Sequence, residues 1–284
     1  MEHNIVVNDA GQFCVRTEKS KNGKNPKTVE TVITVKVGGL TLYPEDMEQA
    51  KLAMAIQMEG QDELPFVMST GAAGTGKTYF GTACLLQREI AAKAAQERNP
   101  RNVVLCRPAV EAEEEIGFLK GGLFEKIAPY FQPVFDVLKE GWRALFKKAD
   151  PVESKGTVYL DINGFEFEIA PIAFMRGRTF KDTVIVVDEA QNLTVGQIKM
   201  VLTRLGENST MYLCGDVTQT DLPDGKESGL KFFVEKVLPK IQAKDEKLGR
   251  KPKYFHTKLT KQYRHEWVGD VVDAFEEAEA ELAA

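Results

Sequence analysis

The chain has 284 residues, of which 43% are hydrophobic and 28% are charged, which is enough apolar material for one large or two small folded domains. Its 37 basic and 42 acidic residues give a net charge of −5, which excludes a basic footprint over the whole protein and confines any nucleic-acid contact to a local patch. The four cysteines are scattered without a CxxC pair, so we expect buried free thiols in a reducing compartment.

Residues 1–42 are predicted to form a small β-rich appendage. The runs NIVVN, QFCVR and TVITVKV are short and rich in Val, Ile and Thr, which favours strands, and EKSKNGKNPK between them is typical of a polar loop. The first residues, MEHNIVVNDAGQ, have the pattern of neither a signal peptide nor a transit peptide. No apolar run approaches membrane-spanning length, so we expect a cytoplasmic protein without a membrane partner.

Residues 43–284 are predicted to form one α/β domain. The apolar runs PFVMS, NVVLC, TVIVV and MYLC alternate with stretches of helical periodicity, which predicts a mostly parallel sheet flanked by helices. GTVYLDINGFEFEIA breaks this order, because it alternates polar and apolar residues around an Asn-Gly pair. Asn-Gly suits the tight turn of a two-residue hairpin, so we expect a β-hairpin insertion near 156–170.

The stretch STGAAGTGKTYF carries the spacing of a phosphate-binding loop, with Gly71, Gly76, Lys77 and Thr78 in the pattern GxxxxGK[ST]. Glycines let successive backbone N–H groups point at phosphate oxygens, and the following helix directs its positive end to the same place. Lys77 is expected to reach the β- and γ-phosphates, and the Thr78 hydroxyl to bind Mg²⁺. We expect ATP to be held by Gly71, Ala72, Ala73, Gly74, Thr75, Gly76, Lys77, Thr78 and Tyr79.

A partner carboxylate for this loop follows the apolar run TVIVV. Asp188 comes directly after that run, where α/β folds place their sites, and is expected to hold Mg²⁺. Glu189 is then placed to orient or deprotonate the attacking water. A third strand, in MYLCGDVTQTDLP, leads to Gln219, which is expected to hydrogen-bond the γ-phosphate or its water.

The motifs GAAGTGKT, RPAV, MRGRT, DEAQN and GDVTQTDLP, followed by SGL, resemble the PhoH family from about Pro44 to Glu276. They are also similar to the first motor domain of superfamily 1 helicases. The resemblance implies a RecA-like P-loop ATPase core related to helicases, with ATP and Mg²⁺ as ligands, an association with RNA and hexameric rings. Lys120 stands where the family usually has a proline, and the first 40 residues contain no cluster of acidic ligands like that of the PIN ribonuclease fused to some members.

The stretch LTKQYRH is similar to the helicase motif whose arginine reaches the γ-phosphate, which indicates Arg264. Because the chain holds one motor core, we favour a ring in which this arginine completes a neighbour's site. Arg176, Arg178 and Arg204 are alternatives. Gln49 lies upstream of the loop, where helicase-like proteins often place an adenine-reading glutamine, although an exposed helical glutamine fits the position equally well.

Further basic residues could contact a nucleic-acid strand through its phosphates. These are Arg107, Arg176, Arg178 and Lys181. We therefore predict a Mg²⁺-dependent ATPase that acts on RNA or single-stranded nucleic acid as a helicase-like ring. The alternatives are a nucleotide-switched stress-response or binding module without unwinding activity and, more remotely, a kinase-like phosphotransferase.

Overall fold

The structure is a computed structural model that describes residues 4–19, 27–57, 64–108, 122–223 and 225–263, with positions 267, 270, 271, 274, 275, 277 and 278. Two residues singled out above, Arg264 and Lys120, lie outside the described residues.

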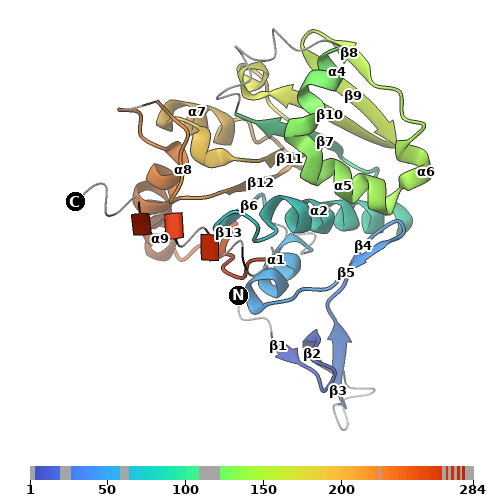
Figure 1. Cartoon of the computed structure of the whole chain (residues 1–284). Helices are drawn as coiled ribbons and strands as arrows, with labels where there is room; N and C mark the ends of the chain where they lie inside the picture. Colours follow the sequence, from blue (N-terminus) through green and yellow to red (C-terminus); the bar gives the residue numbers. More distant parts are fainter. Residues whose placement is uncertain are drawn as a thin grey trace.

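A large, mostly parallel sheet forms the centre of the described chain (Figure 1). Its strand order is β13-β6-β12-β11-β7-β10-β9-β8. The strands from β13 to β10 run parallel, and β9 pairs antiparallel with both of its neighbours, β10 and β8. The bounds are β6 (Phe66–Thr70), β7 (Asn102–Arg107), β8 (Val152–Ser154), β9 (Thr157–Ile162), β10 (Phe165–Pro171), β11 (Thr183–Val187), β12 (Thr210–Gly215) and β13 (Tyr254–Lys258). The predicted α/β fold with a mostly parallel sheet is confirmed.

Helices cover both faces of this sheet (Figure 1). One face packs against α1 (Met47–Ile56), α2 (Lys77–Ala94) and α5 (Gln132–Gly141), and the other against η3 (Ile172–Met175), α7 (Val195–Leu202) and α8 (Gly229–Phe232). The remaining described elements are α4 (Leu123–Ile127), η2 (Ala128–Phe131), α6 (Arg143–Phe146), η4 (Ala190–Asn192), η5 (Phe233–Val237) and α9 (Leu238–Lys247).

The central strand β11 shows why the sequence reads as an unbroken apolar run. Val184 and Val186 belong to the core on the α2 face, whereas Ile185 and Val187 belong to the core on the α7 face. Successive side chains of a strand point to opposite faces, and a parallel strand covered on both sides must therefore be apolar at every position.

A β-hairpin occupies residues 157–171. β9 and β10 pair antiparallel around Asn163 and Gly164, whose φ angles of 60° and 70° are those of the tight turn that Asn-Gly favours. β10 also pairs in parallel with β7, so the hairpin extends the main sheet instead of standing apart from it.

The first 42 residues divide into two parts. β1 (Ile5–Val7), β2 (Phe13–Lys19) and β3 (Lys27–Val32) form a separate antiparallel sheet at the lower end of the molecule in Figure 1. β4 (Val35–Val37) and β5 (Leu40–Leu42) form a second, two-stranded sheet whose Val35 and Val37 are fully buried in the same core as α2 and α5. A domain boundary at residue 42 therefore stays a proposal.

All four cysteines are free and buried, as the scattered spacing predicts. No helix in the described part of the chain is both long and apolar enough to cross a membrane.

Candidate functional site

The glycine-rich loop joins β6 to α2 and depends on its glycines for shape. Gly74 and Gly76 have φ angles of 83° and 79°, in the left-handed region that glycine tolerates best. A Cβ on Gly71 would lie 2.1 Å from the carbonyl oxygen of Leu259, so no side chain fits there. The Thr75 hydroxyl donates to the Ala72 carbonyl at 2.9 Å, and this bond closes the loop on itself.

Lys77 begins α2 and turns its side chain back over the loop. Its ammonium group donates to the carbonyl oxygens of Gly71 at 2.7 Å and Ala72 at 2.8 Å. The same residue is fixed from the other side, because the buried Tyr212 hydroxyl donates to its backbone carbonyl at 2.8 Å. The loop, the lysine and the positive end of α2 thus converge on one point, as binding of phosphate requires.

Asp188 lies where β11 ends, and its side chain is only 6% exposed. The Thr78 hydroxyl donates to its Oδ1 at 2.7 Å, so the two expected Mg²⁺ ligands are in direct contact. A hydroxyl and a carboxylate oxygen are hard donors of the kind Mg²⁺ prefers, and this ion commonly binds through one or two carboxylates together with substrate phosphates and waters. The residues present therefore fit a Mg²⁺ ion carried in with a nucleotide.

Cys214, near the end of β12, is a member of the site that the sequence did not reveal. Its thiol donates to Asp188 Oδ1 at 3.2 Å. Burial and then the nearby Asp188 carboxylate raise the pKa of this thiol well above its usual value, so it keeps the proton that it donates. The sequence indicated only a buried thiol, because nothing in the spacing shows that β12 lies beside β11.

Glu189 follows Asp188 in a left-handed backbone conformation, with φ 51°. Its Oε2 accepts a hydrogen bond from the Gln191 side-chain amide, and its Oε1 lies 3.5 Å from Arg107 Nη2. Gln191 in turn accepts from the backbone N–H of Asp216 at 3.0 Å. Gln191 therefore bridges the DEAQ motif and the GDVTQ motif, whereas the side chain of Gln219 is exposed on the loop beyond.

Arg107 lies beside Asp188 and Glu189, although the sequence suggested that it contacts the phosphates of a nucleic acid. Its Nη1 is 3.8 Å from Asp188 Oδ2 and donates to the Tyr130 carbonyl at 2.6 Å. β7 and β11 are neighbours, with Cys106 opposite Val187, so the residues that follow these two positions also lie side by side.

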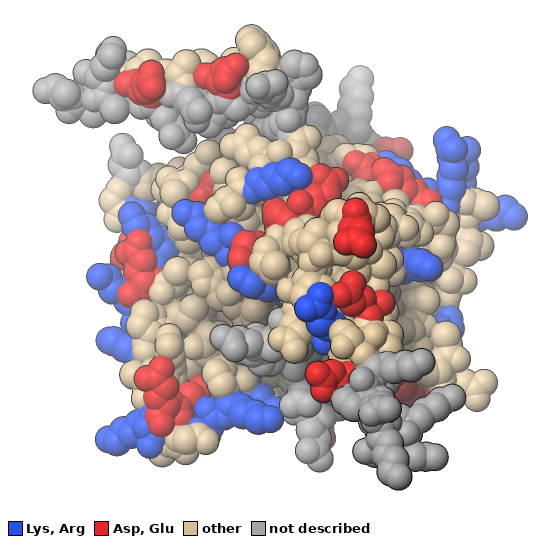
Figure 2. Space-filling model, turned by 90° about the horizontal axis from the view of Figure 1, so that it is seen from below, with Lys and Arg blue, Asp and Glu red and all other residues tan. Residues whose placement is uncertain are grey.

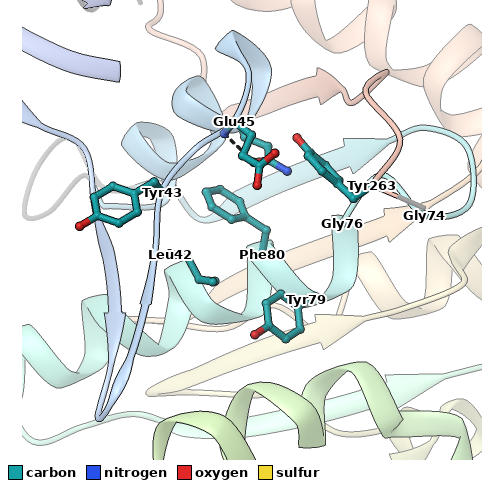
Figure 3. Close-up of a pocket in the computed structure, with 9 residues that line it drawn as sticks. Leu42, Tyr43, Glu45, Gly74, Gly76, Tyr79, Phe80 and Tyr263 are labelled. Atoms are coloured by element: carbon teal, nitrogen blue, oxygen red, sulfur yellow. Dashed lines mark hydrogen bonds between the residues drawn. The ribbon is translucent and has the colours of Figure 1, made fainter. Parts of the chain in front are cut away.

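A cavity of about 370 Å³ opens beside the glycine-rich loop (Figure 3). Its walls are largely aromatic and apolar, and its lining residues are Leu42, Tyr43, Glu45, Gln49, Gly74, Gly76, Tyr79, Phe80 and Tyr263. Such a cavity next to a phosphate loop has the size and chemistry to take the base and sugar of a nucleotide.

Three polar side chains of this cavity are already engaged. Gln49 is buried and accepts through Oε1 from the backbone N–H of Glu45 at 3.1 Å. The Tyr79 hydroxyl donates to Glu140 at 2.7 Å. Tyr263 joins the wall to the loop: its backbone N–H donates to the Gly74 carbonyl at 3.0 Å and its hydroxyl to Asp46 at 3.1 Å.

The arginines named as alternatives to Arg264 have local partners or are exposed to solvent. Arg178 pairs with Glu168 and lies over the Phe180 ring, and Arg204 donates to the Arg178 carbonyl at 2.9 Å. Arg176 is exposed, as is Lys181, which lies 4.0 Å from Glu207. Among the described arginines that the sequence singled out, Arg107 is the one that lies within 4 Å of both Asp188, the expected metal ligand, and Glu189.

Strand order, phosphate loop and strand-end carboxylate are together those of the P-loop NTPase fold class. A family model described as PhoH-like protein matches residues 41–276, and the chain belongs to that family. The resemblance seen in the motifs is thereby confirmed.

Curated relatives agree with this placement. A PhoH-like protein of Mycobacterium tuberculosis is 41% identical over 217 residues, which are 75% of this chain and 54% of the relative. Protein PhoH of Escherichia coli is 44% identical over 170 residues, 60% of this chain and 44% of the relative. The chain thus spans about half the length of these relatives. Among solved structures, the large terminase of a thermophilic bacteriophage in complex with ADP is similar, with a TM-score of 0.47, 11% identity and coverage of 76% of this chain and 46% of that one.

Proposed function

We propose that the chain hydrolyses ATP with Mg²⁺ at the site between the glycine-rich loop and the ends of β11 and β12. The contact between Thr78 and Asp188 is the observation that carries this proposal, because it joins the loop to the carboxylate where a metal bound to the β- and γ-phosphates would lie. When bound, Mg²⁺ would neutralise charge on those phosphates, with Thr78 and Asp188 as its protein ligands.

In this proposal the backbone from Gly71 to Gly76 cradles the phosphates and Lys77 moves from the loop carbonyls to the phosphate oxygens. Glu189 accepts a proton from the attacking water or orients it, and Gln219 contacts the γ-phosphate from the loop after β12. Tyr79 and Gln49 contribute to the aromatic cavity, which takes the base.

Arg264 is proposed to contact the γ-phosphate. We favour contact in the site of a neighbouring subunit, because the chain holds one motor core and the opposite wall of the site must then come from another copy. We further propose a hexameric ring in the cytoplasm, a proposal that rests on the family resemblance and that light scattering of the purified chain would test.

RNA or another single strand is the proposed target of the ATPase. Figure 2 shows Lys and Arg interspersed with Asp and Glu on the face seen from below, without one broad basic area. A nucleic acid would therefore have to bind at a local patch, and such binding weakens steeply as salt increases.

Steady-state ATP hydrolysis with and without single-stranded RNA tests the target. We expect a several-fold stimulation by RNA in the wild-type chain and no hydrolysis in Lys77→Ala. A rate that RNA leaves unchanged would contradict the motor role and favour a nucleotide-switched binding module. Transfer of phosphate to a small molecule in place of release into solution would contradict the ATPase assignment itself.

A further inference from the structure

Arg107 makes a set of contacts that none of the expected roles uses. The guanidinium lies within 3.8 Å of Asp188 Oδ2 through Nη1 and within 3.5 Å of Glu189 Oε1 through Nη2. It is 27% exposed, whereas the Asp188 side chain is 6% exposed, so solvent screens the interaction with Asp188 only in part. One arginine thus faces both carboxylates of the candidate catalytic pair.

The position of this guanidinium is fixed from outside the site. Arg107 Nη1 donates to the backbone carbonyl of Tyr130 at 2.6 Å. Tyr130 belongs to η2, which leads directly into α5, and Phe131 and Phe135 there are buried in the main core. An arginine whose guanidinium is hydrogen-bonded to a packed backbone element has far fewer accessible conformations than a surface arginine.

The two oxygens of Asp188 meet different neighbours. Oδ1 accepts from Thr78 and from the Cys214 thiol, both uncharged groups. Oδ2 faces the positive charge of Arg107. A divalent cation that binds to Asp188 must share this carboxylate with a guanidinium whose Nη1 lies 3.8 Å from Oδ2, and two positive charges drawn to one carboxylate repel each other.

We propose that Arg107 is a positioning residue that sets the affinity of the Thr78–Asp188 pair for a divalent cation. The guanidinium holds Asp188 and Glu189 in place and competes electrostatically with the incoming metal. This inference rests on the proposed function, since it takes Asp188 as a metal ligand.

Binding of Mn²⁺ alone to the full chain tests the proposal, with free Mn²⁺ counted by electron paramagnetic resonance. Neutral Arg107→Gln is expected to bind Mn²⁺ about tenfold more tightly than wild type, because one repelling charge is removed. Its melting temperature without metal should be lower than that of wild type and should rise more on addition of Mn²⁺. Arg107→Lys keeps the positive charge on which the proposed competition depends and should bind Mn²⁺ within about twofold of wild type.

Two controls separate the possible failures. Arg16→Gln removes an exposed arginine paired with Glu30 and should leave Mn²⁺ binding unchanged. Asp188→Asn should lose Mn²⁺ binding; if it binds as wild type does, the metal site proposed for the ATPase is itself wrong. If Asp188→Asn loses binding while Arg107→Gln binds Mn²⁺ equally or more weakly, the metal site stands and the competition by Arg107 is overturned. Arg107→Met, which keeps the apolar stem, replaces Arg107→Gln if that variant does not fold, and the same outcomes decide.

Discussion

Thr78 and Asp188 are 110 positions apart in the sequence, and their side chains are joined by a hydrogen bond of 2.7 Å. The first belongs to the helix that follows the glycine-rich loop and the second to the end of the central strand β11. The strand β12 lies between β6 and β11 and brings Cys214 to the same carboxylate. The ends of three separate strands thus contribute to one site.

Thr78→Ala removes the hydroxyl that is expected to bind Mg²⁺. Asp188 keeps the Cys214 thiol as a donor, so the carboxylate stays in place while the metal loses a ligand. We expect kcat for ATP hydrolysis to fall about a hundredfold, the usual scale for loss of one group that stabilises the transition state. Thr78→Ser keeps the hydroxyl and should retain most of the activity. Equal activity of the alanine and serine variants would show that this hydroxyl does not hold the metal.

Gly71→Ala tests the shape of the loop. The added Cβ would lie 2.1 Å from the Leu259 carbonyl oxygen, and φ at this position is 149°. We expect loss of nucleotide binding and a lower melting temperature, measured by a fluorescent ATP analogue and by thermal unfolding. Gly196→Ala is the matched control, because Gly196 lies in α7 with open space where its Cβ would point. That variant should bind normally and gain up to about 1 kcal/mol from better helix propensity.

Much of this site can be predicted from the sequence because its motifs follow apolar strand runs. Asp188 follows one apolar strand run, and Lys77 and Thr78 follow another. These residues must lie close together if the two strands are parallel and near each other. The placement of Arg107, Gln191 and Cys214 could not be predicted in the same way. It depends on which strands are neighbours, β7 beside β11 and β11 beside β12, and periodicity carries no information on strand order.

For the N-terminal residues, too, the sequence pattern could not predict the packing partners. Alternating residues in TVITVKV predict β-structure but not what the strand packs against. In the structure, Val35 and Val37 pack into the main core under α2 and α5, while β1 to β3 form their own sheet. Tyr43 and Tyr263 likewise line the same cavity, which no local pattern could indicate.

Mixing of two inactive variants tests where Arg264 acts. Lys77→Ala lacks a working site but keeps the arginine, and Arg264→Ala keeps the loop but lacks the arginine. If Arg264 completes the site of a neighbouring subunit, as we propose, mixtures of the two variants should recover ATP hydrolysis. Mixtures that stay inactive at every ratio would mean that the arginine serves the site of its own chain.

Acid stability should depend on Glu89, which is fully buried in α2. Burial alone would raise its pKa, but hydrogen bonds from Arg98 and Arg101 and the charges of Arg101 and Arg88 outweigh burial and lower the pKa from 4.5 to about 2. A carboxyl whose pKa is lower in the folded than in the unfolded state stabilises the fold above pH 4.5, and this contribution is lost as the pH falls towards 2.

Glu89→Gln should therefore lower the free energy of unfolding at pH 7 by about 3–5 kcal/mol, since it leaves buried arginines without their anion. It should also flatten the loss of stability between pH 4.5 and pH 2. Denaturant unfolding across this pH range measures both effects. Glu30→Gln, in an exposed pair with Arg16, should cost less than about 1 kcal/mol. A pH profile that is the same in Glu89→Gln and wild type would refute the assignment to Glu89.

Glu189→Gln at saturating ATP and Mg²⁺ tests the central claim most directly. This variant keeps the size of the side chain but removes the group proposed to activate water. We expect it to bind ATP with an affinity close to that of wild type and to hydrolyse it at least about a hundredfold more slowly. Hydrolysis at the wild-type rate, or a wild-type chain that binds ATP without hydrolysing it, would contradict the ATPase assigned to this site.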